Sequence, residues 1–143
     1  MDKRYASQPI APWYWPAAIA SLVFALIGCA VYGMHAYTDP ATLPLDQRAM
    51  FEAEPVWVTT VLGLASVLGT VGAIILLLRR RLAVPLLLAS LLGAGTWCVG
   101  LLATPRLRDL LSTTEIAVVL VSVAISWTIF WFARHSRQRG WLR

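Results

Sequence analysis

Charged side chains are scarce in this sequence, and none lies inside any of its four long apolar runs. Asp, Glu, Lys and Arg together make up 13% of the 143 residues, against about a quarter in soluble domains. The runs are residues 17–37, 56–78, 82–103 and 116–133. Each is close to the ~20 residues that a helix needs to cross a bilayer core. We therefore predict an all-α polytopic membrane protein, with residues 1–143 forming one transmembrane four-helix bundle.

The spans lack a deep ionisable group, which argues against several functions. Cation-coupled transporters usually carry such a group within the membrane. Small multidrug exporters have this size and four-span plan, but they depend on a glutamate in the first span, and this sequence has none there. A nucleophile with a matching general base is not evident either. We expect no enzyme activity, catalytic residue, cofactor or metal site, and interpret His35 and His135 as interfacial residues on opposite sides of the membrane.

The sequence has two cysteines and no C-x-x-C pattern, which argues against a thiol oxidoreductase. Cys29 and Cys98 lie inside apolar runs, where cysteine usually packs as a small hydrophobe, and no role is assigned to either. Residues 26–29, Leu-Ile-Gly-Cys, also fit the signal of a cleaved bacterial lipoprotein. The residues after Cys29 stay apolar, whereas a lipoprotein tether is usually polar, so a transmembrane span is the favoured interpretation.

Three adjacent arginines, Arg79, Arg80 and Arg81, separate the second and third runs. Guanidinium groups cannot remain in hydrocarbon, so the chain must surface there in a tight transmembrane hairpin. Nine of the 12 basic residues are predicted on that side: Lys3, Arg4, Arg79, Arg80, Arg81, Arg134, Arg137, Arg139 and Arg143. The positive-inside rule then places both termini in the cytoplasm. The net charge of +5 thus reflects topology and not a nucleic-acid partner, and the three arginines are predicted contacts for anionic lipid.

The longest connection, residues 38–55, is predicted on the outer side. Asp46 is a candidate N-cap for a short helix over 47–54, in which Arg48 and Glu52 stand at i,i+4. Arg48, Glu52, Glu54 and Trp57 are the candidate contacts for a partner or solute, because they are polar or amphipathic groups at the membrane interface.

Small residues predict how the spans pack, because close approach and not apolarity holds helices together in lipid. They recur along three runs: Ala17, Ser21, Ala25, Cys29 and Gly33; Thr59, Gly63, Ser66, Thr70 and Ala73; and Ala89, Gly93, Thr96 and Gly100. The fourth run, predicted to be the shortest span, follows a capping-box pattern at Ser112 and Glu115. In that run the small residues one turn apart are Ser122 and Ser126, with bulky residues around them, so we expect it at the edge of the bundle or against a partner.

Several segments resemble a group of small, uncharacterised, four-span bacterial inner-membrane proteins, sometimes labelled sugar-transporter-like. The resemblance is best over residues 50–88 and at the end of the chain, and its motifs are these: Met50-Phe51, Pro55-Val-Trp57, Gly69-Thr-Val-Gly72, Arg79-Arg80-Arg81, Ala83-Val84-Pro85 and Arg139-Gly140-Trp141-Leu142. In that group a methionine precedes the proline, where this chain has Glu54. The resemblance implies the four-span plan and a bacterial inner membrane, but it assigns no catalytic or binding residue.

Two hypotheses of function remain, and a third is weaker. The first is an accessory or structural subunit that binds membrane lipid and another membrane protein, or further copies of itself, through small-residue faces. The alternative is a small transporter or permease component for an uncharged solute such as a sugar, because the spans lack charge. An enzyme acting on lipid is the weakest hypothesis, because no catalytic group is evident.

Overall fold

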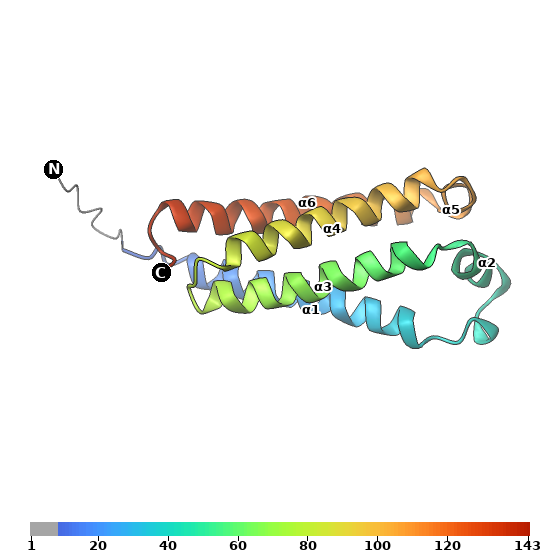
Figure 1. Ribbon diagram of the computed structural model, residues 1–143, viewed down its shortest axis with the longest axis horizontal. Helices are drawn as coiled ribbons and strands as arrows, with labels where there is room; N and C mark the ends of the chain where they lie inside the picture. Colours follow the sequence, from blue (N-terminus) through green and yellow to red (C-terminus); the bar gives the residue numbers. More distant parts are fainter. Residues whose placement is uncertain (1–8) are drawn as a thin grey trace.

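The computed structural model describes residues 9–143, and the described chain is helical with no strands (Figure 1). Its elements are α1 (Tyr14–Tyr37), the 3-10 turn η1 (Pro40–Thr42), α2 (Leu45–Ala53), α3 (Val56–Leu77), α4 (Ala83–Ala103), α5 (Pro105–Leu110) and α6 (Thr113–Gln138). Helices α1, α3, α4 and α6 are long and apolar enough to cross a membrane. This confirms the all-α, four-span prediction.

The four long helices pack in series and not in a closed ring. Extensive interfaces join α1 to α3, α3 to α4 and α4 to α6. Helices α1 and α6 are the two ends of this series, so the edge position predicted for the last span is correct. Its length was predicted wrongly: α6 has 26 residues and is the longest helix, because it continues past the apolar run through the basic residues up to Gln138.

Helix α3 carries two small-residue faces, one for each neighbour. Toward α1, Gly63 lies under the ring of Tyr32, and the Thr70 hydroxyl is 3.1 Å from the Cys29 sulfur. Toward α4, a Cβ added to Gly69 would lie 2.8 Å from the Ser90 hydroxyl. The sequence predicted the first face but not the second, because Gly69 and Gly72 lie beside the line of small residues predicted for this run and are not part of it.

One end of the bundle is closed by the end of the chain. We call it the arginine end; it comprises Arg79, Arg80 and Arg81 together with residues 140–143. Arg79 has a positive φ of 57° and Gly140 one of 74°, so α3 and α6 both stop in a left-handed cap. Beyond these caps the two segments are joined, because the amide of Arg143 donates to the Arg79 carbonyl and the amide of Arg81 donates to the Arg143 carbonyl, at 2.6 and 3.0 Å.

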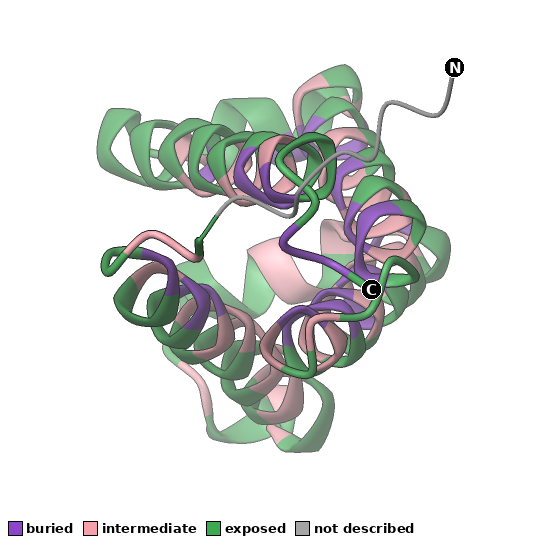
Figure 2. Cartoon of the chain, turned by 90° about the vertical axis from the view of Figure 1, so that its left-hand side faces the viewer, coloured by how far each residue is buried: buried purple, intermediate pink, exposed green. Residues whose placement is uncertain are grey.

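Aromatic side chains fill the space beneath this junction. Trp141 and Leu142 turn back into the bundle and are almost fully buried, and Figure 2 shows this buried stretch crossing the end of the bundle. The hydroxyl of the fully buried Tyr14 donates to the Leu76 carbonyl at 2.7 Å, and its ring contacts Phe132 and Trp141. The last residues of the chain are therefore part of the packed core at this end of the bundle.

The opposite end, which we call the His35 end, carries η1, α2 and α5. The capping box is confirmed, because the Ser112 hydroxyl accepts from the Glu115 amide at 3.3 Å and the Glu115 carboxylate accepts from the Ser112 amide at 2.7 Å. Asp46 was wrongly predicted as a cap, because α2 begins at Leu45 and Asp46 lies in its first turn. Asp39 instead caps η1, accepting from the Ala41 amide at 2.9 Å.

The α3–α4 interface yields a prediction at two neighbouring glycines of one helix. A Cβ at Gly93 would lie 2.9 Å from the Cβ of Ala65 on α3, whereas a Cβ at Gly95 would meet no atom within 4 Å. Gly93→Leu should therefore force α3 and α4 apart and cost about 1–3 kcal/mol of stability. Gly95→Leu is the matched control. Equal melting temperatures for the two variants in detergent would contradict the packing.

Candidate functional site

A cavity of about 300 Å³ lies between the four long helices. It forms because α1 and α6 have no extensive interface with each other, so the side chains of α3 and α4 are left uncovered between them. Its walls combine small residues with aliphatic and aromatic ones, among them Ala25 and Gly28 of α1, Ala65 of α3 and Val123 of α6. Its volume is at the lower limit of the volumes of small-molecule binding sites in proteins.

Five serines line this inner cavity, and all five hydroxyl protons are already used. Four hydroxyls donate to the carbonyl one turn earlier in their own helix: Ser21 to Ala17, Ser66 to Leu62, Ser122 to Val118 and Ser126 to Ser122. The fifth, Ser90 on α4, donates across the interface to the Ala65 carbonyl of α3 at 2.7 Å. These side chains therefore present oxygen lone pairs and methylene groups to the cavity, but no available O–H donor.

A second cavity of about 550 Å³ lies at the His35 end. It is bordered by residues from α1, α2, α3, α4, α5 and α6, so the short outer helices form its rim. Four side chains line both cavities: Val31, Leu62, Trp97 and Val118. The two spaces therefore adjoin at these side chains. We refer to them together as the cleft, which extends from the interior of the bundle to its His35 end.

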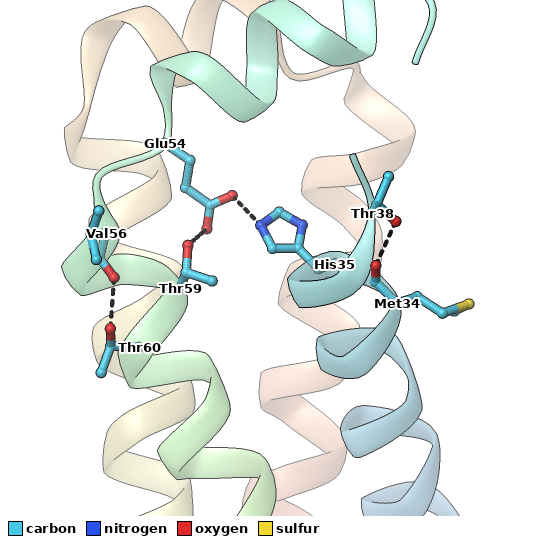
Figure 3. Close-up of polar contacts among 7 residues, drawn as sticks. All are labelled: Met34, His35, Thr38, Glu54, Val56, Thr59 and Thr60. Atoms are coloured by element: carbon cyan, nitrogen blue, oxygen red, sulfur yellow. Dashed lines mark hydrogen bonds and ion pairs between the residues drawn. The ribbon is translucent and has the colours of Figure 1, made fainter. Parts of the chain in front are cut away.

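His35 and Glu54 meet at the rim of this cleft (Figure 3). The Nε2 of His35 is 3.2 Å from a carboxylate oxygen of Glu54, and the other carboxylate oxygen accepts from the Thr59 hydroxyl at 3.0 Å. The imidazole also stacks on the ring of Phe51, with 4.1 Å between ring centroids. This group joins α1 to α2 and α3, and the Glu54 side chain is only 12% exposed.

The four predicted contact residues do not form one cluster. Arg48 and Glu52 form the expected i,i+4 pair, with Nε 2.8 Å from the carboxylate, on the exposed surface of α2. Glu54 points to His35 instead, and Trp57 lies against α4, where its ring reaches the position a Cβ on Gly100 would take. The contact between His35 and Glu54 was not predicted, because 19 positions separate the two residues. The sequence does place both at the same end of the bundle, His35 near the end of the first span and Glu54 just before the second, and this could have indicated the contact.

The three predicted lipid contacts differ in their surroundings. The Nε of Arg79 donates to the Trp141 carbonyl at 2.9 Å, and that of Arg81 to the Leu142 carbonyl at a longer 3.4 Å. The side chain of Arg80 is exposed. Arg79 and Arg81 therefore hold the end of the chain in place, and Arg80 is the residue of the three best placed to reach a lipid headgroup.

The cysteine, histidine and acidic side chains of the described residues form no metal centre. Within residues 9–143, no three His, Cys, Asp or Glu side chains lie close enough together to hold a metal ion. The Cys29 side chain is hydrogen-bonded to the Thr70 hydroxyl at the α1–α3 interface, and Cys98 is buried beside Val58 and Leu101. Both thiols are free.

These surroundings predict that Arg79 and Arg80 have separate roles. Arg79→Gln should lower the melting temperature in detergent, because loss of the bond to the Trp141 carbonyl costs about 1 kcal/mol. Arg80→Gln should leave the melting temperature unchanged and reduce the anionic lipid that mass spectrometry detects after purification. The assignment would be contradicted if the two variants lost the same amount of stability and of lipid.

Comparisons of the chain with models of known protein families, with curated proteins and with solved structures gave no match, so the resemblance to small bacterial inner-membrane proteins stays a prediction.

Proposed function

We propose that this protein is an accessory or structural subunit of a bacterial inner membrane, and that it associates with another membrane protein through the side between α1 and α6. The observation that carries the proposal is the packing in series, which leaves the facing sides of these two helices without an extensive interface beyond the Tyr14–Phe132 contact at the arginine end. Ile27 and Val31 on α1 and Val118 on α6 border this opening. They line the cleft, yet they are 56%, 49% and 60% exposed.

Physical reasons favour association at this side over the rest of the surface. Lipid is as apolar as leucine, so a second membrane protein gains from a shaped surface and not from apolarity alone. The opening between α1 and α6 supplies that shape, because the cleft is hollowed out beneath it. Trp127 and Trp131 of α6 are also exposed, and amphipathic rings of this kind are enriched at the membrane–water interface.

The proposed orientation places the arginine end in the cytoplasm. Arg79, Arg80 and Arg81 lie at that end with the last residues of the chain, whereas Arg48, Arg106 and Arg108 lie on the helices at the His35 end. Lys3 and Arg4, which are predicted on the same side, lie outside the described residues. A cytoplasmic arginine end follows the positive-inside rule, because basic residues in short loops resist translocation.

Fusions to alkaline phosphatase test the orientation, because the enzyme forms its disulfides and becomes active only outside the cytoplasm. A fusion after Asp46 should be active, and a fusion after Arg81 should be inactive. The reverse pattern would overturn the proposed topology.

Photocrosslinking in intact cells tests the contact face. A benzoylphenylalanine placed at Ile27 or Val118 should form a crosslink to a second membrane protein. The same group at Leu92 or Leu64 is the control, because these side chains are similarly exposed, at 63% and 59%, and do not line the cleft. Crosslinks only between copies of this chain would identify a homo-oligomer as the partner, and equal crosslinking from all four positions would contradict the proposed face.

A transporter or permease component for an uncharged solute is the second candidate. The observation that favours it is the cleft, which reaches from the interior to the His35 end. A transport function predicts that an uncharged solute, such as a sugar, enters liposomes that contain this purified protein and no other. Such flux, abolished by a bulky residue in the cleft, would replace the accessory function with transport.

A further inference from the structure

The cleft is accessible from the side of the bundle as well as from its end. Three of its lining residues, Ile27, Val31 and Val118, have about half or more of their surface exposed where a bilayer surrounds the helices. Beneath them lie buried or half-buried residues of α3 and α4, including Ala65, which is 6% exposed. A molecule already dissolved in the bilayer can therefore enter between α1 and α6 without crossing the polar rim.

The inner part of the cleft suits an apolar chain better than a hydroxylated solute. Each of the five serines there has already donated its proton to a backbone carbonyl, and the other lining side chains are Gly or apolar, apart from the indole N–H of Trp97 at the junction of the two cavities. A sugar hydroxyl buried among them could donate to a serine oxygen, but its own oxygen would find almost no donor, at a cost of about 1–3 kcal/mol for each group left unsatisfied. Methylene groups bring no such cost.

The outer part of the cleft is acidic. Its ionisable lining residues within the described chain are His35, Glu54 and Glu115, and no Lys or Arg is among them. Three arginines, Arg48, Arg106 and Arg108, lie on the short helices at this end but do not line the cavity. Arg48 is paired with Glu52 on the exposed surface of α2, and Arg108 lies 3.8 Å from Asp109. Carboxylates at the rim repel a phosphate or carboxylate headgroup and attract an amine, most strongly where burial reduces solvent screening, as at Glu54.

We propose that the cleft binds a single-chain lipid-like molecule with an amine headgroup. Its apolar chain lies in the inner cavity between α1 and α6, and its ammonium group lies at the His35 end beside the carboxylates of Glu54 and Glu115. The inner cavity selects for an apolar chain and the rim selects for a positive head. This ligand site goes beyond association with a membrane protein and does not depend on it.

The probes that test the site are three alkyl chains of one length, each with a photoreactive diazirine in the chain and with an amine, a hydroxyl or a phosphate as headgroup. The purified full-length protein in nanodiscs of zwitterionic lipid is irradiated with each probe, and labelled residues are mapped by mass spectrometry. The amine probe should label α1 and α6 at cleft residues such as Ile27 and Ser122, and unlabelled alkylamine should compete for that labelling. The phosphate probe should label these positions no more than it labels Leu92.

Two pairs of matched variants separate the site from general lipid contact. Ser122→Phe fills the inner cavity, and Thr128→Phe is its control, because Thr128 also donates to the carbonyl one turn earlier but lines neither cavity. Glu54→Gln removes the carboxylate at the rim, and Glu52→Gln removes one outside the cleft. Ser122→Phe should abolish cleft labelling, and Glu54→Gln should weaken amine binding about tenfold, as expected for a lost hydrogen bond to a charged group.

Several outcomes would overturn the proposal. These are cleft labelling by the phosphate probe as strong as by the amine probe, equal amine binding by the Glu54 and Glu52 variants, and amine labelling spread evenly over the bundle surface. The comparison of Glu54→Gln with Glu52→Gln tests the site even if Ser122→Phe does not fold, because neither glutamate substitution changes the inner cavity. The labelling assay contains no second protein, so a negative result there would not bear on the proposed association with a membrane protein. Likewise, a crosslinking experiment that finds no partner would not bear on the proposed ligand site.

Discussion

The junction at the arginine end is the interaction on which the rest of the bundle depends. Helices α1 and α6 share no extensive interface, yet Tyr14, Phe132 and Trp141 bring their ends together there. The Tyr14 hydroxyl binds the last turn of α3, and the Arg79 and Arg81 side chains bind carbonyls of the final residues. In a bilayer, where apolarity alone does not hold helices together, these hydrogen bonds and ring contacts fix the spacing between the first and last helices. The cleft exists because that spacing is held at one end only.

Much of this fold could be predicted from the sequence, because its main signals are local. Runs without charge identified the four spans, the Ser112 and Glu115 spacing identified the start of α6, and the i,i+4 spacing identified the Arg48–Glu52 pair. The extent of α6 was missed because hydropathy reports the apolar part of a helix, and basic residues are good helix formers beyond it. The return of Trp141 into the bundle was missed because a basic tail with one tryptophan gives no sign of the partner it will meet.

The candidate site was less predictable, because its parts are distant in sequence and its character comes from packing. Ser122 and Ser126 were noticed as small residues, but a sequence does not say which side of a helix will lack a neighbour. His35 and Glu54 were each assigned to the interface, and their meeting depends on how α2 turns between α1 and α3. The absence of an available hydroxyl donor in the inner cavity is a property of rotamers, and only the structure shows it.

The one-sided closure of the bundle has a consequence for its exchange with the surrounding membrane. The exposed residues Val31 and Val118, which border the lateral opening, belong to the half of the bundle nearer His35, whereas Tyr14 and Phe132 bring α1 and α6 into contact at the arginine end. A molecule that diffuses in the plane of the membrane therefore meets the opening from a single leaflet. In a bilayer whose two leaflets differ in composition, lipids of one leaflet would reach the opening directly, and lipids of the other leaflet would not.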